Sequence, residues 1–171
     1  MIKYTNPHNS TTNKMEPVKY QAQVKDVRFG DNVTIVEPCN LYGCTIGSHS
    51  FIGPFTEIQR NVSVGEYCKV QSHSFICELV TIGHHCFIGH GVVFINDLFK
   101  EGGPAGGNIE LWKATQIGNH VSIGSNATIL PVSICDNVVI GAGAVVTKNI
   151  TLPGTYAGNP AVLIKSGLLP G

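Results

Sequence analysis

Charged residues are scarce in this chain. Only 13% of its 171 residues are Asp, Glu, Lys or Arg, and eleven acidic residues balance eleven basic ones. A net charge of zero argues against nucleic-acid binding, because proteins that hold a phosphate backbone usually carry a basic surplus. The sequence also lacks a charge-free run of membrane length, and residues 1–20 are too polar for a secretory signal. We therefore expect a cytoplasmic protein that contacts neither nucleic acid nor membrane.

A CxxC pair is absent too, which weakens a zinc-finger interpretation. The six cysteines are expected to be thiols rather than disulfides, as in a reducing compartment. Glycine is abundant by contrast, with 20 residues, and together with the few charges it favours an all-β protein with many tight turns. A chain of this length is expected to form one domain with a buried core.

Large apolar residues recur at every sixth position through the middle of the chain. Helices need spacings of three and four, and simple alternation leaves a six-residue period unexplained. A short strand, a turn and the next strand account for it, and three such units close one triangular coil of about eighteen residues. Stacked coils then bury an apolar column that one repeat could not bury alone. The unbroken series is Ile46, Ile52, Ile58, Val64, Val70, Ile76, Ile82, Ile88 and Phe94, and the pattern resumes at Ile117.

Two positions in each repeat carry small residues. A small or β-branched residue stands four positions after each large one, and it is expected to point inward as well. Glycine often follows the large residue directly, as at Gly47, Gly65 and Gly83. We expect these glycines to supply positive φ angles in the turns, because glycine has no Cβ penalty there.

The end of the chain is specific for one superfamily. "VVIGAGAVVTKNI" followed by "YAGNPAVLIK", together with the repeat, resembles the left-handed parallel β-helix acyltransferases of the hexapeptide-repeat superfamily, over roughly residues 20–165. The left-handed coil is an exception to the usual right-handed crossover, so the handedness rests on this resemblance. The resemblance further implies a homotrimer, with acetyl-coenzyme A bound between neighbouring subunits.

The period divides the chain into segments. We expect an N-terminal lead-in over residues 1–19, a β-helix over 20–150 and a C-terminal tail over 151–171. The period breaks at residues 97–116, where four glycines and a proline predict a long projecting loop. Loops of this length are usually functional or disordered, and in the resembled family this one reaches toward an adjacent subunit. Two spacings shrink to five, from Leu41 to Ile46 and from Ile129 to Ile134, which we interpret as one-residue deletions in turns.

A polar column is expected where the loop departs. Residues eighteen apart should stack on neighbouring coils, which places Arg60, Glu78 and Asn96 above one another. One interpretation is a solvated turn ladder in which Glu78 pairs with Arg60. The other is a functional site at the root of the loop.

The surrounding sequence refines the resemblance. "KVQSHSFICELVTIGHHCFIGHGVVFIND" is similar to N-acyltransferases that act on nucleotide-linked 3-amino sugars, of the dTDP-3-amino-3,6-dideoxyhexose and UDP-aminouronate types. Such enzymes serve cell-surface glycan biosynthesis, including that of lipopolysaccharide. The resemblance implies that Glu78 and Asn96 contact the amino group as catalytic residues, with Arg60, Asp97 and His90 as further substrate-binding residues.

One departure from a related family supports an amine substrate. Galactoside- and maltose-type O-acetyltransferases share the motif around "IGNHVSIGSNATI" but carry a histidine base where this chain has Asn126. A sugar hydroxyl needs such a base, whereas a neutral amine does not. The alternative is a sugar O-acetyltransferase in which His90 or His120 serves as the base.

The coenzyme site is expected toward the C-terminus. Gly141 and its neighbours should leave backbone amides and carbonyls uncovered for a pantetheine arm. The resemblance places Thr147 and Lys148 near the nucleotide of coenzyme A and Lys165 near its 3′-phosphate, which cations favour. The two lysines could equally be ordinary surface charges. The expected cofactor-binding set is Asn126, Gly141, Ala142, Ala144, Thr147, Lys148 and Lys165.

The histidines suggest a competing metal interpretation. Three histidines and a water make a good catalytic zinc set, and His49, His85 and His90 resemble the arrangement of γ-class carbonic anhydrases. The loop and the Glu78–Asn96 column fit an acyltransferase better, so no metal is expected. Cys68 and Cys86 are expected in the core. A third possibility is a non-catalytic hexapeptide scaffold.

Overall fold

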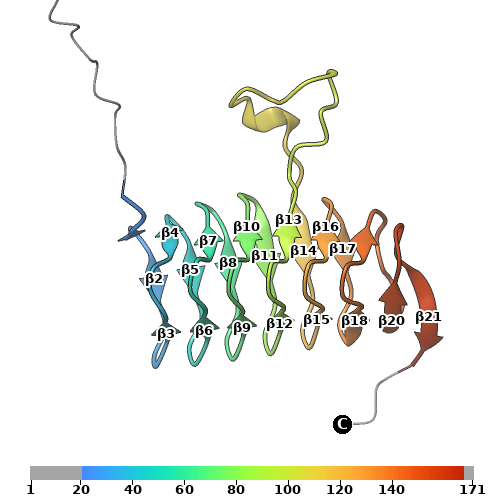
Figure 1. Ribbon diagram of the computed structural model, residues 1–171, viewed down its shortest axis with the longest axis horizontal. Coiled ribbons are helices and arrows are strands. Elements are labelled where there is room, and N and C mark those ends of the chain that lie inside the picture. The colour runs from blue at the N-terminus through green and yellow to red at the C-terminus, as the bar shows by residue number, and fades with distance from the viewer. Residues whose placement is uncertain (1–20, 168–171) are drawn as a thin grey trace, which may run out of the picture.

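The structure, a computed structural model, describes residues 21–167. The lead-in expected over residues 1–19 lies outside this range. The described chain winds into coils stacked along one axis, from β3 at one end to β21 at the other (Figure 1). Successive strands fall in turn into three sheets, called A, B and C below, whose neighbours are parallel throughout the coils. The predicted all-β, left-handed parallel β-helix is confirmed.

The strands are short, and each coil contributes one strand to each sheet. Sheet A contains β1 (Val24–Lys25), β4 (Asn40–Tyr42), β7 (Glu57–Ile58), β10 (Phe75–Ile76), β13 (Val93–Phe94), β16 (Thr128–Ile129) and β19 (Val145–Val146). Sheet B contains β2 (Arg28–Phe29), β5 (Thr45–Ile46), β8 (Ser63–Val64), β11 (Val80–Ile82), β14 (Thr115–Ile117) and β17 (Ser133–Ile134). Sheet C contains β3 (Thr34–Ile35), β6 (Phe51–Ile52), β9 (Lys69–Val70), β12 (Phe87–Ile88), β15 (Ser122–Ile123), β18 (Val138–Ile140), β20 (Gly154–Ala157) and β21 (Val162–Ser166).

The six-residue series forms the core. All of its members from Ile46 to Phe94 are at most 2% exposed, and complete burial of such a side chain contributes about 1.5–3 kcal/mol. The small positions point inward too, and Cys68 and Cys86 are buried there as predicted. All six cysteines are free. Burial raises the pKa of the Cys44 thiol to about 11 and that of the Cys77 thiol to about 12, so both remain protonated near neutral pH.

The glycines that follow the large residues have a different role from the predicted one. Their φ angles are not positive; the left-handed conformation belongs to residues two positions later, such as His49 and Tyr67. A Cβ at Gly47 would lie 2.5 Å from the backbone carbon of Gly65, and one at Gly65 would lie 2.5 Å from the carbonyl oxygen of Gly83. Glycine is therefore required here because adjacent coils approach too closely for a side chain.

The three corners between sheets differ in regularity. The B–C and C–A corners keep the six-residue period, whereas the A–B corner holds both predicted one-residue deletions. The strand register shows this: the partner of Leu41 in sheet A is Ile58, seventeen residues on, but the partner of Ile46 in sheet B is Val64, eighteen residues on. The long loop also leaves from the A–B corner, between β13 and β14 (Figure 1). Every departure from the repeat thus falls on one edge of the solenoid.

The loop projects from the coils and contains one 3-10 turn, η1 (Ile109–Leu111). It ends at residue 114 rather than 116, because Thr115 and Gln116 already pair with Val80 and Thr81 in sheet B. At the other end of the chain, β20 continues sheet C parallel to β18, and β21 returns antiparallel to β20. Within residues 21–167, no helix has the length and hydrophobicity that a membrane crossing requires.

Candidate functional site

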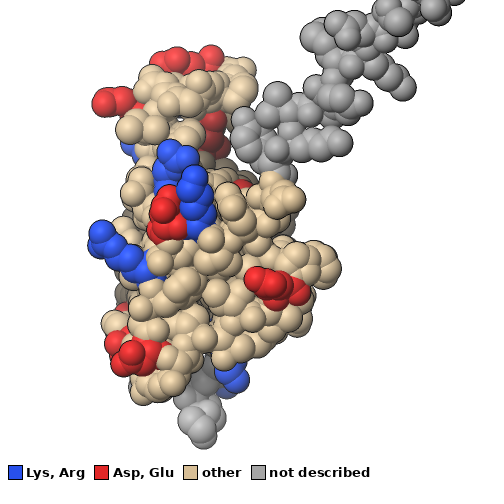
Figure 2. Space-filling view, turned by 90° about the vertical axis from the view of Figure 1, so that its left-hand side faces the viewer, with Lys and Arg blue, Asp and Glu red and all other residues tan. Residues whose placement is uncertain are grey.

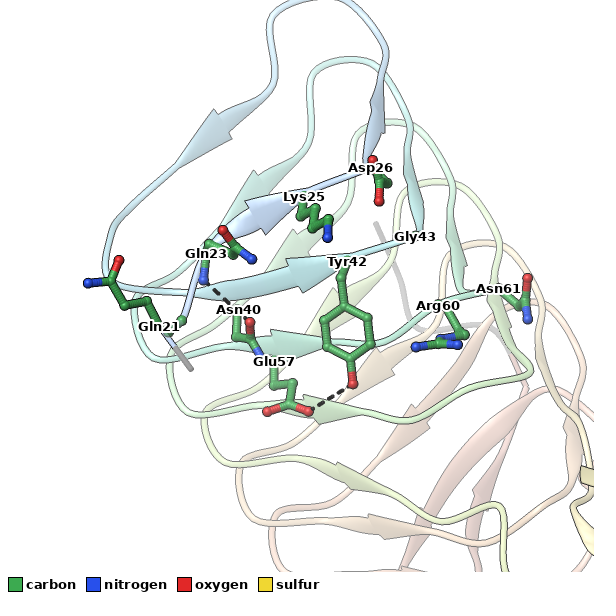
Figure 3. Close-up of a pocket in the computed structure, with 11 residues that line it drawn as sticks. Gln21, Gln23, Lys25, Asp26, Asn40, Tyr42, Gly43, Glu57, Arg60 and Asn61 are labelled. Atoms are coloured by element: carbon green, nitrogen blue, oxygen red, sulfur yellow. Dashed lines mark hydrogen bonds between the residues drawn. The ribbon is translucent and has the colours of Figure 1, made fainter. Parts of the chain in front are cut away.

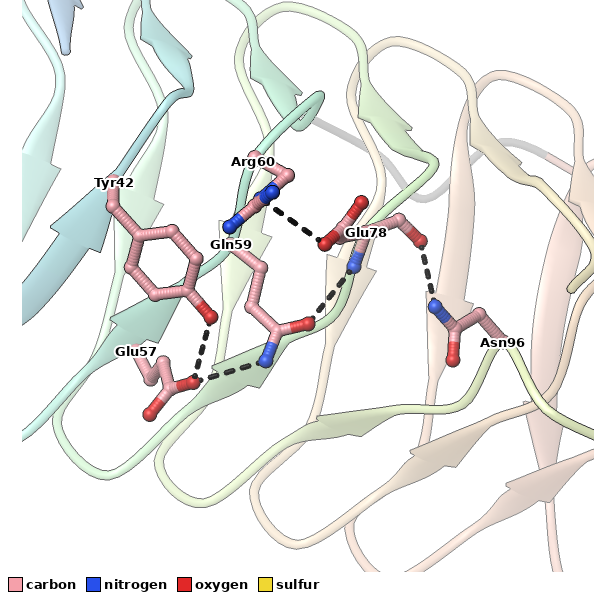
Figure 4. Close-up of polar contacts among 6 residues, drawn as sticks. All are labelled: Tyr42, Glu57, Gln59, Arg60, Glu78 and Asn96. Atoms are coloured by element: carbon pink, nitrogen blue, oxygen red, sulfur yellow. Dashed lines mark hydrogen bonds and ion pairs between the residues drawn. The ribbon is translucent and has the colours of Figure 1, made fainter. Parts of the chain in front are cut away.

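Three polar side chains stand in one column at the A–B corner. Arg60, Glu78 and Asn96 follow β7, β10 and β13, and the strand register places them on consecutive coils (Figure 4). Arg60 Nε lies 3.4 Å from Glu78 Oε1. The Asn96 side-chain amide donates a hydrogen bond of 3.3 Å to the backbone carbonyl of Glu78. The predicted column is present, and the ion pair expected for a simple turn ladder is present with it.

The column continues toward the N-terminal coils through side chains that the sequence had not indicated. Gln59 accepts a 3.3 Å hydrogen bond from the Glu78 backbone amide and donates one of 3.0 Å to Glu57 Oε1. The Tyr42 hydroxyl donates to the same carboxylate oxygen at 3.4 Å. Burial and then the Glu57 carboxylate raise the pKa of Tyr42, so the phenol stays protonated as a donor. A spacing of eighteen residues does not lead to Tyr42. The deletion between Leu41 and Ile46 leaves Tyr42 seventeen residues before Gln59.

The column leaves two acceptors available to a ligand. The Glu78 side chain is only 15% exposed, whereas that of Arg60 is 63% exposed. Water therefore screens the ion pair from the arginine side, and such pairs contribute little to stability. Within the described residues, the Asn96 side-chain oxygen has no protein donor, and Glu78 Oε2 is not used in the ion pair. A carboxylate oxygen and an amide oxygen on adjacent coils can accept two hydrogen bonds from one nitrogen.

Asp97 has a structural contact that its sequence position did not indicate. One carboxylate oxygen accepts the Phe99 amide at 2.9 Å and the other accepts the Ala105 amide at 2.7 Å. A bridge between Asp97 and Trp112 closes the base of the loop. The side chain expected to bind substrate therefore fixes the conformation of the loop beside Asn96.

The expected coenzyme residues lie in three places. Asn126 and the turn Gly141–Ala144 lie at the C–A corner, and the Asn126 amide donates to the His90 carbonyl at 2.8 Å. Thr147 and Lys148 follow β19 and lie at the A–B corner, two coils beyond Asn96. Lys165 lies on β21 at the end of sheet C. Within one chain, these residues therefore do not form a single site.

The turn at residues 141–144 is less open than expected. The amides of Gly141, Gly143 and Ala144 already donate to carbonyls of the chain, at 2.8, 2.8 and 3.2 Å. The Ala144 methyl group is fully buried in the core. The prediction of uncovered amides is wrong for these three groups, because the coil turn itself uses them. Ala142 and Gly143 are exposed, so their surface and carbonyls remain accessible.

His90 belongs to a pair at the C–A corner. Its Nδ1 atom lies 2.8 Å from the Ser72 hydroxyl on the preceding coil. His90 is thus separated from Glu78 and Asn96 by the width of sheet A. All histidines within residues 21–167 lie at the B–C or C–A corners, so the Glu78–Asn96 column has none beside it in the same chain.

The histidines of the metal interpretation are held in other contacts. His49 and His85 lie at the B–C corner with Tyr67 stacked between them, at ring-centroid distances of 4.7 and 5.0 Å. His85 stacks in turn on His120 at 4.9 Å. His90 lies at a different corner. In the described part of the chain, no three His, Cys, Asp or Glu side chains converge as a metal site would require.

Comparisons with known proteins agree with this architecture. Residues 43–78 match the family described as "Bacterial transferase hexapeptide (six repeats)", and residues 115–148 match the "Hexapeptide repeat of succinyl-transferase". The bifunctional protein GlmU of Streptococcus uberis is 33% identical over 153 residues, which cover 84% of this chain and 33% of GlmU. The chain thus spans about a third of the length of the curated relatives it matches.

Solved structures share the fold at lower identity. AntD, an N-acyltransferase from Bacillus cereus in complex with dTDP and 3-hydroxybutyryl-CoA, superposes with a TM-score of 0.69 at 22% identity, covering 80% of this chain and 81% of AntD. PerB from Caulobacter crescentus, in complex with CoA and GDP-perosamine, gives 0.58 at 14% identity, covering 83% and 57%. The predicted resemblance is confirmed: the chain is a hexapeptide-repeat protein that resembles the acyltransferases of that superfamily in sequence and in fold.

Proposed function

We propose that this protein is an acetyl-coenzyme A-dependent N-acetyltransferase that acts on the C3 amino group of a dTDP- or UDP-linked amino sugar. One observation carries the proposal: the Glu78 carboxylate and the Asn96 side-chain oxygen form a column of acceptors at the root of the loop, which suits the two N–H groups of an amine. Hydroxyl acetylation needs a base at the reacting oxygen, whereas a neutral amine attacks unaided. The complexes of AntD with dTDP and an acyl-CoA, and of PerB with CoA and GDP-perosamine, support this substrate class.

The two acceptors would set the direction of attack. A neutral amine has two N–H groups and one lone pair, so hydrogen bonds to Glu78 and Asn96 aim the lone pair away from the column. The nitrogen attacks the thioester carbonyl, a C–N bond forms as the C–S bond breaks, and the amine proton passes to the leaving thiolate. A hydrogen-bond donor at the thioester oxygen would stabilise the developing oxyanion. Holding both reactants in place contributes several kcal/mol.

The proposal includes a homotrimer with sites between subunits. The acceptor column, Thr147 and Lys148 lie at the A–B corner, whereas Asn126 and Ala142 lie at the C–A corner. Two copies placed with the A–B corner of one against the C–A corner of the next would line one groove with both sets. The exposed surface of Ala142 and Gly143 has room for a pantetheine arm, because a Cβ at Gly143 would meet nothing within 4 Å. Lys148 and Lys165 would meet the coenzyme phosphates.

A second candidate is a sugar O-acetyltransferase. The 2.8 Å contact between Ser72 and His90 favours it, because a hydroxyl bonded to one ring nitrogen orients the other as a base. Across a subunit groove, His90 would face the acceptor column of the neighbouring copy.

A thiol-release assay with acetyl-coenzyme A and a panel of nucleotide sugars tests the proposal. We expect release with a dTDP- or UDP-linked 3-amino sugar and none with the matching 3-hydroxy sugar. Release with the hydroxy sugar, lost in a His90→Ala variant, would instead establish the second candidate.

A thermal-shift series separates the enzyme from the remaining possibilities. Acetyl-coenzyme A should raise the melting temperature, since a ligand that binds only the folded state stabilises it. Stabilisation by zinc in place of acetyl-coenzyme A would favour the carbonic anhydrase, and stabilisation by neither would favour a scaffold. Light scattering should give three times the mass of one chain.

A further inference from the structure

The polar groups considered above lie on the outside of the solenoid. Charged side chains of both signs are spread over its surface at the N-terminal end (Figure 2). The cavity of about 890 Å³ at the A–B corner is lined by Tyr42, Glu57 and Arg60 among others (Figure 3). It adjoins Glu78 through Arg60 and so belongs to the site already described. The interior holds reactive groups of another kind, because two cysteine thiols meet there.

Cys68 and Cys86 occupy the same position on consecutive coils. Each directly precedes a residue of sheet C, and those two residues, Lys69 and Phe87, are partners in the strand register. Neighbouring coils are about 4.8 Å apart, which lies within the Cα separations of roughly 4.4–6.8 Å that a disulfide spans. Both side chains point into the core, where Cys68 is fully buried and Cys86 is 2% exposed. The backbone therefore already has the spacing of a disulfide.

The two thiols are hydrogen-bonded to each other as well as to the backbone. When both are neutral, Cys68 Sγ donates to the Gly83 carbonyl and Cys86 Sγ donates to the Gly118 carbonyl, each at 3.1 Å. A hydrogen bond from the Cys86 thiol to the Cys68 sulfur lowers the pKa of Cys68, and the same contact raises the pKa of Cys86. Because the thiolate is the reactive form of cysteine, Cys68 is the nucleophile of the pair and Cys86 keeps its proton.

The other four cysteines, all within residues 21–167, have no cysteine at their own position on an adjacent coil. The strand register places Thr56 beside Cys39, Val62 beside Cys44, Gln59 beside Cys77 and Gly118 beside Cys135. A disulfide between any of these four would require the coils to shift, because its geometry is narrow. The pair is therefore distinguished by its position in the repeat.

We infer that Cys68 and Cys86 form an oxidisable dithiol, which hydrogen peroxide converts into a disulfide between consecutive coils. The Cys68 thiolate attacks one peroxide oxygen, the O–O bond breaks, and the other oxygen takes up a proton and leaves as water. Cys86 Sγ then attacks the sulfenic acid on Cys68. The S–S bond forms as the S–O bond breaks, and the hydroxyl group leaves with the Cys86 proton as a second water. Two thiols are oxidised and one peroxide is reduced, independently of acetyl transfer.

The disulfide would close one complete coil. Cys86 follows Cys68 by eighteen residues, and the segment between them contains β9, β10 and β11 and carries Glu78 at the A–B corner. Such a cross-link lowers the conformational entropy of the unfolded chain and so stabilises the folded one. Because both thiols are buried, peroxide reaches them only when this coil opens transiently. Oxidation should therefore be slower than that of an exposed thiol.

Oxidation of the full chain with hydrogen peroxide tests the inference. After the remaining thiols are blocked, peptide mapping by mass spectrometry should find Cys68 joined to Cys86. The melting temperature should rise by about 6–12 °C, as expected for a closed loop of this length in a chain of this size, and dithiothreitol should reverse the rise. Recovery of both cysteines as thiols, or as sulfinic or sulfonic acids, without a cross-linked peptide would overturn the inference.

Serine variants supply the controls. Ser50 occupies the same position one coil earlier, where its hydroxyl donates to the Gly65 carbonyl and accepts the Cys68 amide, each at 3.0 Å. A hydroxyl therefore fits this part of the core, and melting temperatures measured before peroxide show whether each variant has folded. Cys68→Ser and Cys86→Ser should each abolish the rise that peroxide causes, whereas Cys135→Ser should retain it. An equal rise in Cys68→Ser and in the wild type would show that this pair is not the oxidised one.

Discussion

The B–C and A–B corners of this solenoid differ in how regularly their turns and side chains repeat from coil to coil. At the B–C corner, His49, Tyr67, His85 and His120 occupy one left-handed position on successive coils and stack their rings, with interplanar angles of 14°, 3° and 3°. At the A–B corner the turns change length, the loop is inserted, and the side chains differ from coil to coil. Similar residues on successive coils form a stack at the B–C corner, whereas different residues on successive coils form a ladder of unlike polar groups at the A–B corner.

The difference shows how a repeat protein can acquire a site. At a regular corner, each side chain contacts the residue at the same position of the next coil, so its surface is not available to a ligand. At the A–B corner, a deletion places Gly43 against Arg60. The inserted loop begins directly after Asn96, and no similar polar residue takes the corresponding position on the β16 coil. The candidate site lies between a deletion on one side and an insertion on the other, while the core beneath continues unchanged.

The largest expected effect comes from the core that both corners share. Ile76→Ala removes a fully buried side chain and should lower the free energy of unfolding by about 2–5 kcal/mol. Urea denaturation at a fixed protein concentration measures it. Thr81→Ala, on the exposed face of the next strand, is the control and should change stability by less than about 0.5 kcal/mol. A loss below about 1 kcal/mol in Ile76→Ala would mean that the coils are not tightly packed.

The next largest effect should distinguish the A–B corner from the B–C corner by its influence on activity. Glu78→Ala removes an acceptor of the column and should lower kcat/KM for the amino sugar at least tenfold, about 1.4 kcal/mol. Asn96→Ala should act similarly. Glu66→Ala makes the same change at the B–C corner, where the carboxylate is exposed, and should leave kcat/KM unchanged. Steady-state kinetics with acetyl-coenzyme A in excess measure both. Equal losses in Glu78→Ala and Glu66→Ala would remove the functional distinction between the corners.

The period of six was sufficient to predict the coil, because burial of its members depends only on spacing. Spacing also predicted the Arg60–Glu78–Asn96 column, since no deletion separates these coils. It failed for Tyr42, because the short turn shifts the register by one residue. Glu57 was missed for another reason: it lies on β7, three residues before the column position of Arg60. The ring stack could have been found: Tyr67 stands eighteen residues from both His49 and His85. The histidine spacing alone is also compatible with the metal interpretation, whereas the tyrosine between the two histidines indicates a stack.

Other features could not be predicted from spacing. The contacts of Asp97 depend on how a glycine-rich loop folds back, which no repeat dictates. Thr147 and Asn126 were expected at one site, but they follow strands of sheet A and sheet C respectively and so face different corners. Only the order of sheets in each coil reveals this.

A smaller effect is expected from the ring stack. Tyr67→Asn removes the ring between His49 and His85 while keeping a residue that tolerates positive φ. Two aromatic pairs of about 0.5–1.5 kcal/mol each are lost. Because Tyr67 is half exposed, stability should fall by the lower end of their sum, about 1 kcal/mol, with kcat/KM unchanged. Tyr67→Phe keeps the ring and should melt like the wild type. Loss of activity in Tyr67→Asn, with its stability intact, would show that the regular corner also takes part in function.

The smallest effect concerns the end of the same corner. Asp136 Oδ1 accepts the Asn119 backbone amide at 2.8 Å, and Oδ2 accepts the Asn119 side-chain amide at 3.2 Å. These hydrogen bonds, the backbone one foremost, lower the pKa of Asp136. Because the folded pKa is below the unfolded one, this contribution to stability is complete above the usual aspartate pKa. It is lost as the pH falls through the lowered value. Carboxylate NMR titration should show Asp136 ionising below its usual pKa of 3.8, and Asn119→Ala should move the value part of the way back. A titration at or above the usual value in the wild type would show that this regular corner does not hold its turns by the contacts described.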